Sequence, residues 1–173
     1  MFLSPLQVVS QFPVMPGARV ADFGSGTGEH ALLLSERIGE DGAVYAFDIN
    51  AGHVESLVRE KTRRSLSNLL SLGADLNEGV PLKSGVLSAA LVSNTLHALS
   101  KREVFMRELN RVLSLNAPVM FVDWIHSFKD MGPAETRVVY PSDAVHLFEA
   151  NGFSVGKMLP AGTHHYAFIA RKV

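Results

Sequence analysis

The chain contains no cysteine among its 173 residues, which excludes disulfide bonds, a cysteine nucleophile and thiolate metal sites. It also lacks any apolar run near the roughly 20 residues that a membrane span requires. The net charge of −1 gives no sign of a broadly basic nucleic-acid-binding surface. Residues 1–12 carry no basic leader, so they do not resemble a signal peptide. We therefore expect no nucleic-acid partner, no membrane span and a cytoplasmic location.

Hydrophobic residues make up 47% of the chain and charged residues 19%, which is typical of a globular protein. The length favours a single domain covering residues 1–173. Segments of strand-like pattern alternate with segments of helical spacing, which favours a mostly parallel sheet with helices on both faces. Strands are expected at residues 19–23, 43–47, 69–74, 87–92, 119–124, 153–158 and 166–170. Helices are expected at residues 4–12, 27–38 and 51–64, after a capping box at 100–103, and from 141 to about 150.

The last two expected strands must be antiparallel to each other. Residues 159–165 join them, and this link is too short for the crossover of a dozen or more residues that parallel neighbours need. We therefore predict an α/β, doubly wound fold. Its seven-stranded sheet is mostly parallel and has an antiparallel C-terminal strand.

A glycine-rich segment, Val20 to His30 (VADFGSGTGEH), lies between an expected strand and an expected helix. Glycines occupy positions 24, 26 and 28, and Ala31, Leu34 and Ile38 follow at helical spacing. A strand that turns through glycines into a helix directs backbone N–H groups and the positive helix end at one small volume. Because glycine permits close approach, that volume can hold part of a nucleotide-like ligand.

A second acidic position supports this interpretation. The apolar run 43–47 ends in Asp48, about 20 residues after the glycines. A carboxylate at the tip of the second strand is well placed to bind both hydroxyls of a ribose.

The glycine spacing distinguishes two cofactors. A dinucleotide fingerprint would place its last small residue at Glu29, where glutamate prevents close packing and repels a pyrophosphate. The order DFGSGTG, residues 22–28, instead resembles motif I of the class I S-adenosylmethionine-dependent methyltransferases, with Asp48 matching their acidic residue after strand 2. The predicted sheet with its antiparallel end is the architecture of the same family.

The resemblance extends over essentially the whole chain from Arg19. It is strongest to small proteins similar to the ubiquinone/menaquinone-biosynthesis methyltransferases, whose helix and fifth strand resemble residues 102–124, REVFMRELNRVLSLNAPVMFVDW. That family usually ends the helix in Lys-Pro-Gly-Gly, whereas this chain has Ser-Leu-Asn-Ala-Pro at 114–118. Asn116 can adopt the left-handed turn conformation, so the departure is compatible with the fold.

The resemblance implies S-adenosylmethionine as cofactor and S-adenosylhomocysteine as product. It implies that Asp75 accepts a hydrogen bond from the adenine amino group and that Leu76 and Ile49 pack on the adenine. Asn94 follows the fourth strand, near the methionine part, and His30 is in reach of the cofactor carboxylate. The expected cofactor-binding set is Gly24, Ser25, Gly26, Gly28, His30, Asp48, Ile49, Asp75, Leu76 and Asn94. Structural roles remain open for several of these: a turn for Asp75, a cap for Asn94, core packing for Ile49 and a surface position for His30.

The methyl acceptor is expected beside strand ends that face the ligand crevice. His97, Trp124 and His126 follow such strands, and either histidine can line the acceptor pocket or act as a base. No pair of histidines has metal-ligand spacing, so no metal is expected. The sequence identifies no catalytic residue and leaves the oligomeric state open. It predicts a small molecule or a protein side chain as acceptor.

Two alternatives to a methyltransferase remain at this stage. One is a non-catalytic protein that binds S-adenosylmethionine as a partner subunit. The other is an NAD-dependent oxidoreductase, which Glu29 disfavours. An oxidoreductase would bind NAD, whereas a methyltransferase and a binding subunit would both bind S-adenosylhomocysteine. Methyl transfer to an acceptor distinguishes the methyltransferase from the binding subunit.

Overall fold

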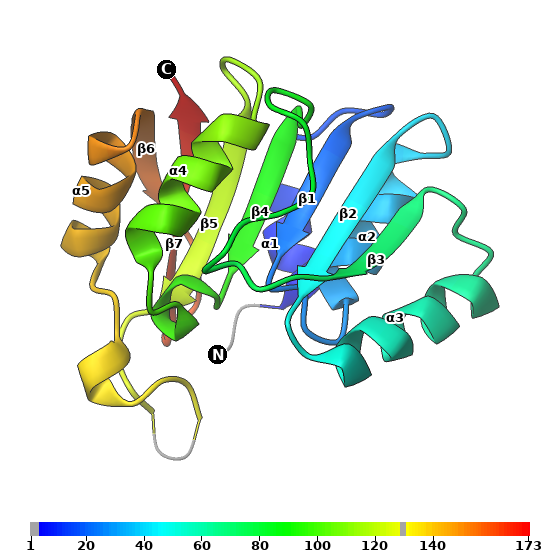
Figure 1. The fold of residues 1–173 in the computed structure, drawn as a ribbon. Helices are drawn as coiled ribbons and strands as arrows, with labels where there is room; N and C mark the ends of the chain where they lie inside the picture. Colours follow the sequence, from blue (N-terminus) through cyan, green and yellow to red (C-terminus); the bar gives the residue numbers. More distant parts are fainter. Residues whose placement is uncertain (1–3, 129–130) are drawn as a thin grey trace.

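The computed structural model describes residues 4–128 and 131–173. Seven strands form one sheet in the order β3-β2-β1-β4-β5-β7-β6 (Figure 1). The strands are β1 Arg19–Phe23, β2 Ala43–Asp48, β3 Leu69–Gly73, β4 Ala89–Ser93, β5 Pro118–Trp124, β6 Phe153–Leu159 and β7 His165–Lys172. Strands β1 to β5 pair in parallel, and β7 runs antiparallel to both β5 and β6. The predicted fold class is confirmed, including its antiparallel end.

Helices cover both faces of the sheet. They are α1 Pro5–Gln11, α2 Glu29–Ile38, α3 Ala51–Arg63, α4 Arg102–Val112 and α5 Pro141–Ala150, with short 3-10 helices η1 Leu96–Ala98 and η2 Glu135–Arg137. Helices α4 and α5 lie in front of the sheet in Figure 1, and their buried side chains belong to one core cluster. The buried side chains of α1, α2 and α3 belong to a second cluster on the opposite face.

In each core cluster, a stripe of apolar residues on the helices packs against alternate residues of the strands. The stripe Ala31, Leu34 and Ile38 of α2 is buried, as its spacing predicted. The stripe Phe105, Leu109 and Val112 of α4 is buried as well, and packs near an aromatic group that includes Phe121 and Phe148, whose rings are 5.1 Å apart. Burial of these large side chains holds the helices against the sheet.

The start of α4 differs from the prediction. We expected Ser100 to cap the helix in a capping box with Glu103, but the helix begins after Lys101, which makes no side-chain cap. Ser100 instead donates both its N–H and its hydroxyl to Asn77 Oδ1, at 3.1 and 3.2 Å, and Lys101 N–H donates to the same oxygen at 2.8 Å. A side chain 23 residues away along the chain therefore replaces the expected local cap. A capping box does occur at Ser4 and Gln7, where α1 begins.

The carboxyl ends of the parallel strands meet along the lower edge of the sheet in Figure 1. Strand β1 pairs with β2 on one side and β4 on the other, so the strand order reverses there. In open α/β sheets, ligands bind at this edge and beside such a reversal. Within the described ranges, no helix is long and apolar enough to cross a membrane.

Candidate functional site

The glycine loop between β1 and α2 is fastened to the end of β2. The N–H groups of Gly24 and Ser25 both donate to Phe47 O, at 2.8 and 2.9 Å, and Gly26 N–H donates to Asp48 Oδ2 at 2.7 Å. We expected these N–H groups to face a ligand, and for these three residues that expectation is wrong. Their hydrogen bonds shape the loop and leave its outer surface for the ligand.

Each glycine of the loop has its own physical reason. A Cβ at Gly24 would lie 2.3 Å from the Thr95 hydroxyl oxygen, and one at Gly28 would lie 2.4 Å from a methyl group of Leu57. Gly26 differs, because a Cβ there meets nothing within 4 Å, although its φ of +54° disfavours other residues. Gly26 therefore faces open space, whereas Gly24 and Gly28 allow close packing.

Asp48 joins the glycine loop to the start of α3. Its Oδ2 accepts the Gly26 N–H, while its Oδ1 accepts the Asn50 N–H at 2.8 Å and lies 3.3 Å from His53 Nδ1. The carboxylate is therefore held in one orientation. Its side chain keeps 12% of its surface exposed, at the tip of β2.

Two cavities lie at the carboxyl edge of the sheet, one on each side of the glycine loop. The Asp48 cavity has a volume of about 350 Å³ and is lined by Gly24, Gly26, Asp48, Ile49, Ala74, Asp75, Leu76, Asn77, Asn94, Thr95, Ala98 and Leu99. The His30 cavity has a volume of about 360 Å³ and is lined by Pro5, Val8, Gly24, Ser25, Gly26, Thr27, Glu29, His30, Ser93, Asn94, Val122 and His165. Gly24, Gly26 and Asn94 line both cavities, so the two are neighbours at these residues.

The Asp48 cavity combines apolar walls with fixed polar groups. Leu76 is buried, whereas the Ile49 side chain is 71% exposed. Asp75 Oδ1 accepts both the backbone N–H and the side-chain amide of Asn77, each at 2.9 Å. These hydrogen bonds, the backbone one first, lower the pKa of Asp75. An apolar pair beside an ionised carboxylate suits a flat ring that carries an amino group.

Two buried polar atoms occur at the end of β1 and at the start of α2. Asp22 Oδ2 and His30 Nε2 have no hydrogen-bond partner among the described residues. Burial, and secondarily the charge of Asp48, raises the pKa of Asp22 to about 7, and burial lowers that of His30 to about 4. Buried polar atoms without partners are costly, so they mark places where a ligand or ordered water completes the structure.

Asn94 occupies the junction of the two cavities in a rare backbone conformation. Its φ is +53°, and its N–H donates to Val122 O at 2.9 Å. Thr95, the next residue, is buried and donates its hydroxyl to Phe23 O at 2.8 Å. A left-handed non-glycine residue held in this way is a feature that clusters at functional sites.

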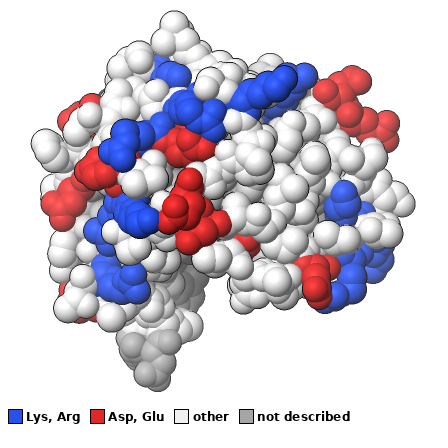
Figure 2. All heavy atoms as spheres, viewed as in Figure 1, with Lys and Arg blue, Asp and Glu red and all other residues white. Residues whose placement is uncertain are grey.

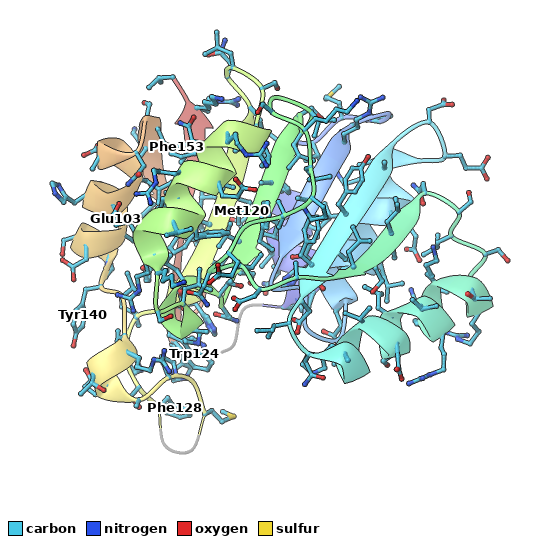
Figure 3. All side chains as sticks on the ribbon, viewed as in Figure 1. Glu103, Met120, Trp124, Phe128, Tyr140 and Phe153 are labelled. Carbon is cyan, nitrogen blue, oxygen red and sulfur yellow. The ribbon has the colours of Figure 1, made fainter. Side chains whose placement is uncertain are left out.

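Nine of the ten expected cofactor residues line one or both cavities, and Gly28 packs against Leu57 instead. The three expected acceptor residues line neither. His97 Nδ1 lies 2.6 Å from Asp123 Oδ1, and His126 Nε2 lies 3.2 Å from His164 Nδ1. Trp124 lies at the lower end of β5 in Figure 3, with Phe128 beyond it. Their assignment to the acceptor remains a prediction.

Sequence reasoning missed residues that reach the His30 cavity from far along the chain. His165 comes from the start of β7, where it pairs in register with Trp124, and its ring lies 4.3 Å from the indole. Pro5 and Val8 come from α1. No local motif marks these residues, although the alternation of β7 does place His165 on the face opposite Tyr166.

Charged side chains of both signs alternate over the face shown in Figure 2. No group of three or more potential metal ligands occurs among residues 4–128 and 131–173.

Comparisons with known proteins agree with this geometry. Residues 20–116 match the family model described as a methyltransferase domain. The chain is similar to a solved SAM-dependent methyltransferase from Aquifex aeolicus, with a TM-score of 0.90 and 27% identity, over 99% of this chain and 91% of that one.

Curated relatives include the ubiquinone/menaquinone biosynthesis C-methyltransferases UbiE of two Xanthomonas species. The protein from Xanthomonas oryzae is 26% identical over 166 residues, and that from Xanthomonas axonopodis is 33% identical over 135 residues. These alignments cover 95% and 70% of this chain but only 62% and 53% of the relatives. The chain thus spans little more than half the length of the curated relatives it matches. Neither alternative function finds support among these proteins.

Proposed function

We propose that this chain, which belongs to the methyltransferase domain family and shares the S-adenosylmethionine-dependent class I fold, transfers the methyl group of S-adenosylmethionine to a small acceptor. The observation that carries the proposal is the pair of cavities that meet at Gly24, Gly26 and Asn94. A cofactor with a nucleoside at one end and an amino acid at the other requires two connected compartments of different chemistry.

The Asp48 cavity suits the adenosine end. The Asp48 carboxylate is held at the tip of β2, where it can accept charge-assisted hydrogen bonds from both hydroxyls of a ribose in place of solvent. Ile49 and Leu76 supply apolar surface for the adenine, and Asp75 supplies an acceptor for its amino group. The exposed Ile49 side chain gains burial only when such a ring is present.

The His30 cavity suits the amino-acid end and part of the acceptor. His30 Nε2 lacks a partner within the described residues and can hydrogen-bond the cofactor carboxylate. Ser25 lines this cavity, and Asn94 lines both cavities. When bound, S-adenosylmethionine supplies a methyl group activated by the adjacent sulfonium. The contribution of the chain is to align the acceptor with that methyl group and to exclude water.

For the acceptor we propose an electron-rich ring that carries hydroxyl groups, of the quinol type. The support is the function of the relatives, which are C-methyltransferases of ubiquinone and menaquinone biosynthesis. His97, Trp124 and His126 lie at the ends of β4 and β5 and are the proposed acceptor-side residues. An aromatic wall and polar hydrogen-bonding groups together suit a hydroxylated ring.

Thermal shift and calorimetry with S-adenosylmethionine, S-adenosylhomocysteine and NAD test the cofactor. We expect S-adenosylhomocysteine to raise the melting temperature and NAD to leave it unchanged, because a ligand that binds only the native state stabilises it by mass action. A folded protein that ignores millimolar S-adenosylhomocysteine contradicts the proposal. Release of S-adenosylhomocysteine with a panel of quinols, phenols and amines then tests transfer, and a protein that binds the cofactor without any turnover is a binding subunit.

A further inference from the structure

We propose that His97 is the general base that takes the proton from the methyl acceptor, and that Asp123 positions its ring and stabilises the charge that forms on it. This inference rests on the proposed function, because it assigns a role within that reaction. It is carried by the contact between the two side chains and by their place at the ends of β4 and β5.

Asp123 is fully buried and accepts hydrogen bonds from three directions. His97 Nδ1 lies 2.6 Å from Oδ1, Trp124 N–H donates to the same oxygen at 2.8 Å, and His97 N–H donates to Oδ2 at 3.2 Å. An ionised carboxylate can only accept, so Nδ1 of His97 donates to it, and in the neutral imidazole Nε2 then keeps its lone pair. The ring is therefore set in the tautomer that accepts a proton at Nε2.

The carboxylate does more than orient the ring. When Nε2 accepts a proton, the imidazolium gains a charge-assisted hydrogen bond to a carboxylate that has 0% exposure. In a buried setting this attraction is screened less than at the surface. The same geometry, a buried carboxylate behind a histidine, stabilises the imidazolium that forms during proton abstraction in serine hydrolases.

Four other histidines near the site are less suited to accept a proton, and His53 has a longer contact with its carboxylate. Burial lowers the pKa of His30, His164 and His165, which weakens each as a proton acceptor. His126 faces the imidazole of His164 rather than a carboxylate. His53 Nδ1 lies 3.3 Å from Asp48 Oδ1, a longer contact than that of His97, and the Asp48 side chain is 12% exposed whereas Asp123 is fully covered.

His97 lies near the two cavities without lining either, and its charge acts on His165, which lines the His30 cavity. It follows Asn94, the residue at the junction of the cavities, by three positions, and lies in η1 directly after β4. The His97 side chain keeps 16% of its surface exposed while its partner is covered. Charged or titratable groups from three other elements face the pair or its helix. The Asp123 carboxylate acts on His165 and Tyr166 of β7, while Arg102 of α4 and Arg137 of η2 donate to Leu96 O and Ala98 O of η1.

The proposed proton transfer balances with methyl transfer. The acceptor hydroxyl gives its proton to Nε2 of His97, and an electron pair of the acceptor oxygen or of its conjugated ring carbon forms the new bond to the methyl carbon. The electron pair of the broken carbon–sulfur bond stays on sulfur. For transfer to carbon, the ring then loses the proton of that carbon to solvent and regains its aromaticity. Imidazolium and Asp123 remain paired until His97 releases its proton to solvent.

The test begins with two measurements that need no turnover. Calorimetry of S-adenosylhomocysteine should give the same affinity for His97→Gln as for the unchanged protein, since His97 lines neither cavity. Nitrogen-15 spectra of the free protein should show His97 with its hydrogen on Nδ1, and Asp123→Asn should alter that signal. The histidine on α5, His146, provides the matched control as His146→Gln, because it is exposed and remote from the site.

Kinetics with 1,4-naphthohydroquinone and catechol complete the test, with tryptamine as an amine whose neutral form has a free lone pair and needs no such base. For the hydroxylated rings we expect His97→Gln to lower kcat about 100-fold or more with the KM for S-adenosylmethionine unchanged. The unchanged protein and His146→Gln should lose rate tenfold per pH unit on the acid side of the profile, and His97→Gln should lose that dependence. Asp123→Asn should lower kcat less than His97→Gln.

Several results overturn the inference. They are a Nε2–H tautomer, a His97→Gln kcat within threefold of normal, an unchanged pH profile, or turnover of tryptamine without turnover of either hydroxylated ring. Absence of all turnover while S-adenosylhomocysteine binds also overturns it. If the unchanged protein does not bind S-adenosylhomocysteine at all, the proposed function itself fails.

Discussion

The two cavities are built in different ways. The Asp48 cavity is made mainly by residues that directly follow β1, β2, β3 and β4, and hydrogen bonds between neighbouring loops fix its shape. The His30 cavity is assembled from α1, the glycine loop, the first turn of α2, β4, β5 and the start of β7. The first is a set of strand tips, and the second is a meeting of segments spread over nearly the whole chain.

The two cavities should therefore respond differently to substitutions. At the Asp48 cavity, backbone conformation and one carboxylate determine the shape, so small local changes should disturb ligand binding strongly. Around the His30 cavity and the His97–Asp123 pair, side chains from distant segments supply the chemistry. Changes there should alter reaction with the acceptor more than binding of the cofactor.

Gly26→Val should be the most damaging change at the cavity junction. The branched side chain enters the space that both cavities share, and the φ of +54° adds roughly 1–2 kcal/mol of strain. Calorimetry should find S-adenosylhomocysteine binding weakened about 1,000-fold or more. Gly85→Val is the control, because Gly85 has a similar φ of +67° and equally open space but lies outside both cavities. Equal loss of binding in both variants would show that strain alone is responsible.

Asp48→Ala should weaken S-adenosylhomocysteine about 100-fold. The change removes the expected charge-assisted hydrogen bonds to the ribose, each worth about 1.5–3 kcal/mol, and releases Gly26 N–H. Asp41→Ala, an exposed turn position, should bind normally. An unchanged dissociation constant for Asp48→Ala would remove the carboxylate from the cofactor site and break the contrast between the two cavities.

Asp22→Asn should stabilise the protein, and increasingly so as pH rises. The folded pKa of about 7 exceeds the ordinary value of 3.8, so between these values the folded state binds more protons than the unfolded state, and stability falls as pH rises. Asparagine cannot ionise, so the variant does not lose stability in this way as the pH rises. Urea unfolding should therefore show a gain for Asp22→Asn that grows by about 2 kcal/mol from pH 5 to pH 8. A gain that does not change with pH would show that Asp22 is not held protonated in the folded state.

Ile49→Ser should have the smallest effect. Ile49 is 71% exposed, so its loss should barely change the free energy of unfolding. Burial of its side chain by adenine is worth about 1 kcal/mol, which predicts roughly fivefold weaker S-adenosylhomocysteine binding. Leu115→Ser, at 67% exposure and away from both cavities, should leave binding unchanged. Identical affinities for the two variants would exclude Ile49 from the adenine site.

Local pattern predicted most of the elements, because strand and helix periods and glycine positions act over a few residues. The antiparallel C-terminal strands followed from the length of one link. The start of α4 did not follow, since Asn77 supplies the cap from the loop after β3. The N–H groups of the glycine loop were misjudged for the same reason, because their acceptors, Phe47 O and Asp48 Oδ2, lie on another strand.

The sequence by itself determined the order of the elements, the glycine loop, the family and nine residues that line the two cavities. Those features are encoded by short-range spacing and by composition. Only the tertiary structure decided that His165 joins the His30 cavity and that Asp123 pairs with His97. It also decided that Asp22 is buried where its charge is costly. These three features depend on which distant segments of the chain lie next to each other at the edge of the sheet. Strand order and side-chain direction decide this, and both are set only when the whole sheet has formed.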